Sequence, residues 1–447
     1  MKNYRSAIYG VLILFMFIPL KNLSTQNIQL IQDAEIENTL LEWILPIYEV
    51  AGLSSNSVKI YIINDEQINA FVAGGQNIFI HTGLILNASE PDAIIGVMAH
   101  EIGHIAGGHL IRTYSAQEQA TTTAVVGTII TAGLLAMGKV MDLDIKDGTN
   151  LATIGPTIAQ RSFFKHSREN EQTADISAIK YLLAVQRPIE PLIKLLKKIG
   201  KKELLHENRQ DPYLRTHPFV KDRVEILESS GENKFTKNFK EKIQYERMVA
   251  KIIAFTKSPG KTLLLYPSEN GSLVNSYARA IAYFKMPDLE KGLKEINALI
   301  KNNPEDPYFP ELLGQMLFEN GEIEKAIEAL ELSSKLLPTE PNIMLALANA
   351  QMEAEKRHLT LKARKNLKEI IKIAPDKIFA WRLLSIAEER LGNRGNANLA
   401  AAEEAYRSGK FKLAIAFAEK ARKNFNKGAP NDLRAEDIIF FAERYIK

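Results

Sequence analysis

The sequence predicts a mostly α-helical chain, with an α+β domain in its first part and an α-solenoid in its second. In the first part, short β-rich runs stand between segments whose apolar residues recur at helical spacing. In the second part, a helical pattern returns after about 34 residues, the period of stacked helix–turn–helix repeats. The chain has 447 residues, too many for one core of ordinary size, so we expect two or three domains.

The first residues have the layout of a secretory signal peptide. Lys2 and Arg5 form a positively charged start, and the 14 residues of Ala7–Leu20 are apolar. That stretch is short for a membrane span. We therefore expect residues 1–25 to be a signal peptide for export. The alternative is an N-terminal anchor in the inner membrane, because no typical cleavage site is visible.

The charge of the chain gives no reason to expect a nucleic-acid partner. The formal net charge is +4, and cleavage near Thr25 would reduce it to +1 because Lys2, Arg5 and Lys21 would be lost. A composition of 46% hydrophobic and 25% charged residues is that of an ordinary globular protein.

The first domain, expected at residues 26–235, contains segments with readable patterns. Three predict helices and three predict strands, two of the strands forming a pair joined through Gly74 and Gly75. The helical segments are Gln29–Ala51, Pro91–His109 and Ser167–Leu183, and the strand segments are Val58–Ile63 and the two parts of Ala70–Ile80.

Proline spacing indicates the repeats. Pro304 and Pro338 are 34 residues apart, and Pro338 and Pro375 are 37 apart, which predicts tetratricopeptide-type repeats with a three-residue insertion near Lys356–Leu359. One such unit cannot bury its apolar face alone, so the units must stack. We expect a linker helix region at residues 236–261 and the repeats at residues 262–447.

His100-Glu101-Ile102-Gly103-His104 is an HEXXH motif within an apolar helical segment. Residues four apart lie on one face of a helix, so both imidazoles can reach one metal ion. Glu101 projects beside them and can act as the general base for a water molecule, as in zinc peptidases. The chain has no cysteine, so its metal ligands must be histidines and carboxylates. We expect one Zn²⁺ per chain.

A catalytic zinc ion usually takes three protein ligands, so a third ligand is needed. An HExxHxxGxxH motif would place it where Leu110 stands, and His109 is one residue short. On a continuous helix His109 would point off the metal-facing side, so we interpret it as a polar residue at the helix end. Glu171, on a second helix, is the better candidate, and Asp175 one turn later could orient a ligand histidine.

Four stretches and the C-terminal repeats resemble a known family. The stretches are NAFVAGGQNIFIHTGLI, VMAHEIGHIAGGHL, SRENEQTAD and THPFVKDR. In this order they resemble the zinc metallopeptidases that include the CAAX prenyl endopeptidases, and most closely the exported bacterial branch, the β-barrel assembly-enhancing proteases. The resemblance covers nearly the whole chain. It implies a gluzincin-like HEXXH peptidase domain followed by an α-solenoid of tetratricopeptide repeats.

The resemblance also implies a site and a role. It implies zinc ligands at His100, His104 and Glu171, catalysis by Glu101, and periplasmic quality control of outer-membrane proteins. The substrates would be misfolded or stalled outer-membrane proteins, and the repeats would bind substrate or the outer-membrane assembly machinery. The sequence departs from the family pattern in the inserted second repeat and in the poorly formed end of the signal peptide.

His217 and Arg223 lie in the THPFVKDR stretch. His217 could donate a hydrogen bond to the oxyanion of a tetrahedral intermediate. It could instead occupy the fourth zinc position in a resting state, or be a structural turn residue. We expect Arg223, with Asp175, to support the ligands from behind.

The run Gly74–Ile80 predicts an edge strand of the catalytic cleft. An extended substrate could add to such an edge through main-chain hydrogen bonds, which makes Gly75, Asn77 and Phe79 candidate substrate-binding residues. The alternative is an interior hairpin.

Residues 120–138 carry no charge over 19 residues, long enough to span a membrane on length alone. A single span there would separate His104 from Glu171 and make the metal site impossible. The stretch is therefore half of a hairpin or, as its five threonines and three glycines favour, a helix over the cleft or in peripheral contact with a membrane surface.

Two functions compete. The first is an exported zinc endopeptidase, and the second is a chaperone or adaptor with a closed or structural zinc site. Glu101 favours the enzyme, because a structural zinc ion needs no acid between its two histidine ligands.

Overall fold

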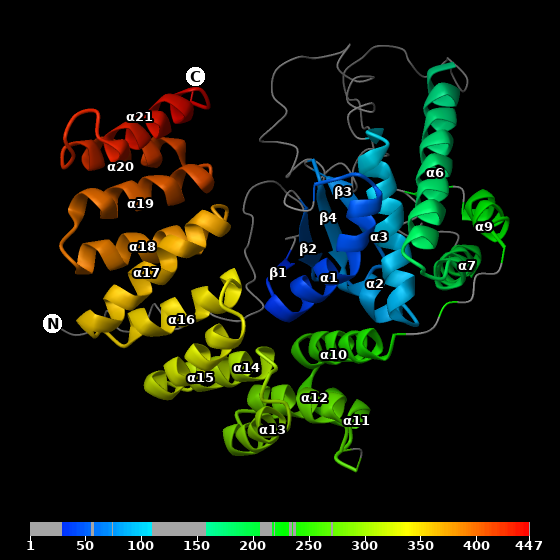
Figure 1. The fold of residues 1–447 in the computed structure, drawn as a ribbon, viewed down its shortest axis with the longest axis horizontal. Helices are drawn as coiled ribbons and strands as arrows, with labels where there is room; N and C mark the ends of the chain where they lie inside the picture. Colours follow the sequence, from blue (N-terminus) through cyan, green and yellow to red (C-terminus); the bar gives the residue numbers. More distant parts are fainter. Residues whose placement is uncertain are drawn as a thin grey trace. The chain divides into compact units, whose positions relative to one another are not determined.

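The computed structural model describes residues 29–54, 58–73, 75–109, 158–205, 217–218, 220–231, 235, 238–269 and 271–446. The chain divides into two compact units between Thr256 and Lys257 (Figure 1). The expected signal peptide at residues 1–25 and the uncharged stretch at residues 120–138 lie outside the described residues.

The first unit contains a four-stranded mixed sheet. Its strand order is β1-β2-β4-β3, in which β2 and β4 run parallel and the other neighbours run antiparallel. Inward-facing residues of the sheet join the main core, and alternate residues such as Phe71 and Phe79 form a smaller cluster. The strands are β1 (Leu30–Ile31), β2 (Lys59–Ile63), β3 (Ala70–Ala73) and β4 (Asn77–His81).

This order shows that the expectation of an edge strand at Gly74–Ile80 was wrong. Asn77 and Phe79 lie on β4, which is paired with β2 on one side and with β3 on the other. Gly75 lies in the turn between β3 and β4 with φ +96°. The edge strands of the described sheet are β1 and β3, and β3 is the one that borders β4. The pairing of β3 with β4 joins neighbouring residues and has a local sequence pattern. The parallel pairing of β4 with β2 joins segments that are further apart, and it leaves no pattern in the sequence.

Helices surround α3 in the first unit. α3 packs against α1, α6 and α7, and nearly every residue from Pro91 to Gly103 is buried. Such an apolar helix is typical of the centre of a domain. The helices are α1 (Ala34–Val50), α2 (Thr82–Asn87), α3 (Pro91–Ala106), α6 (Ile158–Ala184), α7 (Glu190–Leu205), α9 (Val220–Glu228) and α10 (Phe239–Thr256).

α10 falls within the range that the sequence assigned to a linker. It belongs to the first unit, because Met248 and Ile252 are buried in the same core as α3. Lys251 of α10 is also buried and forms an ion pair with Asp33 at 2.7 Å. The Lys-rich composition that suggested a linker therefore includes buried, paired charges.

The second unit is an α-solenoid in which each helix packs against the next one along the chain (Figure 1). This confirms the predicted repeats. The three-residue insertion lengthens a helix, since α17 has 17 residues where α13 and α15 have 14. The helices are α11 (Pro259–Leu265), α12 (Leu273–Lys285), α13 (Leu289–Asn302), α14 (Tyr308–Glu319), α15 (Ile323–Leu336), α16 (Pro341–Glu353), α17 (Arg357–Ile373), α18 (Ile378–Arg390), α19 (Arg394–Arg407), α20 (Phe411–Arg422) and α21 (Pro430–Glu443).

Among the described helices of both units, none combines the length and the apolar character that crossing a membrane requires.

Candidate metal centre

The HEXXH motif lies in the C-terminal half of α3. His100 and Glu101 are buried, and His104 follows one turn later, near the helix end at Ala106. The side chains of His100 and His104 therefore project from the same side of the helix, with Nε2 atoms 3.0 Å apart.

α6 brings the carboxylates to this face of α3 (Figure 1). The two helices approach closely at Gly103, where an added Cβ atom would lie 2.8 Å from the carbonyl oxygen of Ala174. Glu171 and Asp175 stand one turn apart on α6, on either side of this contact. The glycine inside the motif thus allows the second helix to reach the histidines.

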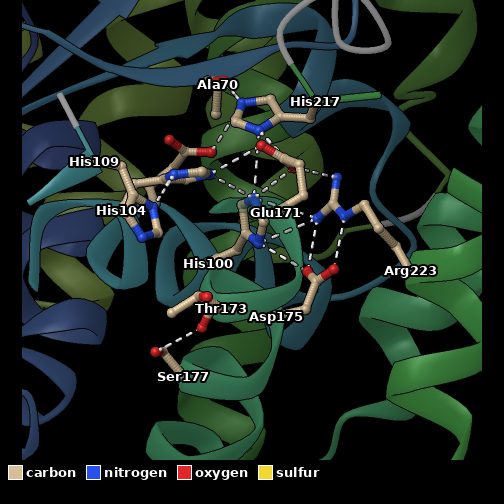
Figure 2. Close-up of polar contacts among 11 residues, drawn as sticks. Ala70, His100, His104, His109, Glu171, Thr173, Asp175, Ser177, His217 and Arg223 are labelled. Carbon is tan, nitrogen blue, oxygen red and sulfur yellow. Dashed lines mark hydrogen bonds and ion pairs between the residues drawn. The ribbon is translucent and has the colours of Figure 1, made fainter. Parts of the chain in front are cut away.

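Four side chains converge on one point. His100, His104, Glu171 and His217 each offer one ligand atom, and these atoms lie within 4.8 Å of one another (Figure 2). Carboxylate oxygens of Glu171 lie 3.3 Å from Nε2 of His100 and 3.3 Å from Nε2 of His104. The sequence prediction named the same histidine pair and the same glutamate as metal ligands.

Asp175 and Arg223 support His100 from the other side. The Asp175 carboxylate lies 2.8 Å from Nδ1 of His100, so Nδ1 carries the proton and Nε2 turns its lone pair to the cluster. Arg223 donates two hydrogen bonds of 2.9 Å to Asp175, through Nε and Nη2. All three side chains are fully or almost fully buried.

His217 lies just before α9 and closes the cluster. Its Nδ1 is 3.2 Å from Glu171 and 3.3 Å from Nε2 of His100. Its Nε2 faces the other way, 3.3 Å from Glu101 Oε1 and 3.3 Å from the main-chain oxygen of Ala70 on β3 (Figure 2). His217 therefore contacts two candidate ligands, the candidate base and the edge strand.

The electrostatics suit the roles of His104 and Glu171. Burial and the Arg223 charge lower the pKa of His100, but Asp175 and Glu171 outweigh them and raise it to about 9, so His100 gives up a proton when a metal ion binds. Burial lowers the pKa of His104 to about 3, which keeps its imidazole neutral. Burial alone would raise the pKa of Glu171, but the nearby His217 and Arg223 and the close contacts with His100 and His104 hold it well below its usual value. Glu101 has a raised pKa, and burial is the main cause. A neutral histidine and an ionised carboxylate are the forms that bind a metal.

The donor set fits a zinc ion. Ligand atoms arranged as a tetrahedron about 2.0–2.1 Å from zinc are separated by about 3.3–3.4 Å. The five separations given above, which use both oxygens of Glu171, are 3.0–3.3 Å, and with one ligand atom from each residue all four atoms lie within 4.8 Å of one another. A second observation is that Glu101 Oε1 is buried and accepts no hydrogen bond from the described residues, although His217 Nε2 lies 3.3 Å away; such an oxygen is suited to a water molecule at the site.

The three predicted substrate-binding residues lie on β4 and in the turn before it. Phe79 is buried between Tyr61 and Phe71, with ring centroids 4.9 Å and 5.0 Å away, and Asn77 pairs with Ala73 in the sheet. The main-chain oxygen of Ala70, which sequence reasoning missed, is the part of the sheet that reaches the cluster.

His109 is outside the ligand group but touches it. Its Nδ1 lies 2.9 Å from Nδ1 of His104. The sequence interpretation assumed a helix continuing through His109, whereas α3 ends at Ala106. Gly107-Gly108 was the signal for that ending, because glycine pairs commonly terminate helices.

Comparison with known proteins agrees with this architecture. Residues 31–230 match peptidase family M48, and residues 277–341 match the tetratricopeptide repeat. The order of the two matches is the order predicted from the sequence.

Relatives cover most of the chain. It is 24% identical over 419 residues to the beta-barrel assembly-enhancing protease of Escherichia coli (strain K12), which covers 88% of this chain and 81% of that protein. It is 25% identical over 420 residues to a putative beta-barrel assembly-enhancing protease of Vibrio cholerae, with coverage of 88% and 82%. The crystal structure of MamA covers 37% of this chain and 94% of its own at 16% identity, but the TM-score of 0.29 is too low to support an argument.

Proposed function

Because residues 31–230 form a metallopeptidase domain of family M48, followed by tetratricopeptide repeats, we propose that this chain is a zinc-dependent endopeptidase of the periplasm. Its substrates are misfolded or stalled outer-membrane proteins. The observation that carries the proposal is the convergence of His100, His104 and Glu171 beside the buried Glu101.

His100, His104 and Glu171 would hold the zinc ion, and Asp175 with Arg223 fixes the ring of His100. When bound, zinc lowers the pKa of a coordinated water molecule toward neutrality and polarises the scissile carbonyl. Glu101 takes a proton from the attacking water and returns it to the leaving amine. Its raised pKa favours this exchange, because a general base works best when its pKa is near the working pH.

The substrate chain adds to the edge strand β3. The amide of His81 donates to the carbonyl of Asn69 at 3.0 Å, so Asn69 bonds inward to β4. Alternation along an antiparallel strand then directs the main-chain groups of Ala70 and Val72 outward. An extended peptide paired with these groups would lie next to Glu101, whose neighbour His217 is in contact with Ala70.

His217 closes the resting site. Three contacts support this role over a role in binding the oxyanion. One ring nitrogen occupies the fourth corner of the ligand group, while the other lies against Glu101 and the outward carbonyl of Ala70. A substrate needs all three places, so His217 must leave them before the enzyme can act.

The proposed substrate class and partners are based on the similar proteins reported above. Those in E. coli and V. cholerae are named for enhancing β-barrel assembly, so we assign outer-membrane proteins to this chain as substrates. The repeats bind the substrate or the assembly machinery. The signal peptide at residues 1–25 directs export, and residues 120–138 make a peripheral membrane contact or cover the cleft.

The test is proteolysis of one outer-membrane β-barrel protein in two forms. One form is unfolded and freshly diluted from urea, and the other is folded in detergent. The purified protein is expected to cut the unfolded form, to lose this activity in a chelator, and to regain it when zinc is restored. Cleavage that survives chelation would contradict the metal mechanism. If both the wild type and His217→Ala bind the unfolded protein and neither cleaves it, the result would favour the chaperone or adaptor alternative.

A further inference from the structure

We propose that His109 is a positioning residue that fixes the ring of His104 for metal binding, and that the Gly107-Gly108 turn exists to place it there. The proposal rests on the proposed metal site. It adds a member to that site from a segment in which no role was expected.

The first observation is the contact between the rings of His104 and His109. Nε2 of His104 lies among the ligand atoms, 3.0 Å from Nε2 of His100 and 3.3 Å from Glu171. A neutral imidazole that uses Nε2 as a ligand carries its proton on Nδ1, which must find an acceptor when buried. The atom that Nδ1 of His104 meets is Nδ1 of His109, at 2.9 Å (Figure 2). His109 therefore accepts this hydrogen bond through Nδ1.

The second observation is the glycine turn between His104 and His109. Gly108 has φ +63°, a left-handed conformation that favours glycine and reverses the chain after α3. Gly107 has an ordinary helical φ of −71°, so its own backbone does not require glycine. The space does, because a Cβ atom there would lie 2.4 Å from Nε2 of His109. The ring of His109 thus occupies the place of a side chain at Gly107.

Burial supports the same assignment. Ala106 is exposed and Gly107 and Gly108 are half-buried, yet His109 is only 4% exposed. Each of the two histidines of the motif then has its own support. The carboxylate of Asp175, on α6, orients His100. The neutral ring of His109, five residues after His104 in the same stretch of chain, orients His104.

The experiment compares zinc affinity among four variants of the full chain, measured by competition with a fluorescent chelator. His109→Ala is expected to bind zinc roughly 10–100-fold more weakly, the usual loss when a partner behind a metal ligand is removed. His109→Asn should recover most of the affinity, because its Oδ1 stands where Nδ1 stood, whereas His109→Gln should not, because its amide reaches only the position of Nε2. Gly107→Ala, which keeps His109 but displaces its ring, should resemble His109→Ala.

The visible spectrum of the cobalt(II)-substituted proteins is the second readout, since it reports ligand geometry and does not depend on peptidase activity. It should change in His109→Ala and Gly107→Ala and return in His109→Asn. Wild-type affinity and spectrum in His109→Ala would overturn the proposal, as would rescue by glutamine and not by asparagine. Wild-type zinc binding that is lost in Glu171→Ala shows that the site itself exists, so failure of the positioning role is distinguishable from failure of the proposed function.

Discussion

His217 shows how much one side chain can control in this site. It is 4% exposed and contacts the ligand atoms with Nδ1 and the candidate base Glu101 with Nε2. A group that only binds the oxyanion has no need to touch the metal ligands in the resting enzyme. The geometry therefore supports a closing role, which is opposite in sign to an oxyanion role when the side chain is removed.

We predict that His217→Ala raises the steady-state rate of cleavage of an unfolded protein while zinc content stays at one per chain. Removal opens the fourth corner of the ligand group, frees Glu101 and exposes the carbonyl of Ala70. Adding Glu101→Gln to this variant should abolish the gained activity, which shows that the activity comes from this site. A fall of roughly 10²–10³-fold at full zinc occupancy would refute closure and assign His217 to the oxyanion.

At the scale of secondary-structure elements, the site depends on how closely two helices pack. Gly103 stands between the two histidines on α3, and its missing side chain lets the backbone of α6 pass at Ala174. α6 carries both Glu171 and Asp175, so the separation of the helices sets the distance from carboxylate to imidazole. The same α3 uses Gly96 to approach Leu192 on α7, a helix that carries no ligand.

Gly103→Ala is expected to weaken zinc binding by more than tenfold and to destabilise the first unit by about 1–3 kcal/mol, the usual cost of overpacking. The added Cβ would meet the carbonyl oxygen and Cα of Ala174 at 2.8 and 3.0 Å, and backbone atoms cannot rotate away. Gly96→Ala is the matched control, since its Cβ would meet Leu192 at 2.8 Å without touching α6. Equal zinc affinity in the two variants, measured by chelator competition, would contradict this account of Gly103.

At this scale, the sequence could predict features whose residues are close together in the chain, and not contacts between distant segments. The spacing of His100 and His104 is local, because four residues along a helix fix two side chains on one side, and it predicted the pair. The hairpin of β3 and β4 is also local. Which strand of the hairpin forms the edge depends on the parallel pairing of β4 with β2, a contact between distant segments. The same limit left the contact between His217 and Ala70, 147 residues apart, outside sequence reasoning.

At the scale of the whole molecule, two units have separate tasks. The first unit, which ends at Thr256, contains all the candidate ligands, and the second is a stack of helical repeats. The repeats were predicted because periodicity spreads one signal over many residues. The position of the boundary was harder to predict, because the charges of α10 suggested solvent exposure while Lys251 is buried against Asp33 and Glu35. The repeats thus offer a surface for protein partners on a unit that carries none of the candidate ligands named above.

The measurement that tests the central claim most directly is the steady-state rate of cleavage of one unfolded outer-membrane protein by Glu101→Gln beside the wild type. The variant keeps His100, His104 and Glu171, so both proteins should contain one zinc per chain. Without the base, the rate should fall by roughly 10²–10⁴-fold. Equal rates at equal zinc content would contradict the proposed mechanism.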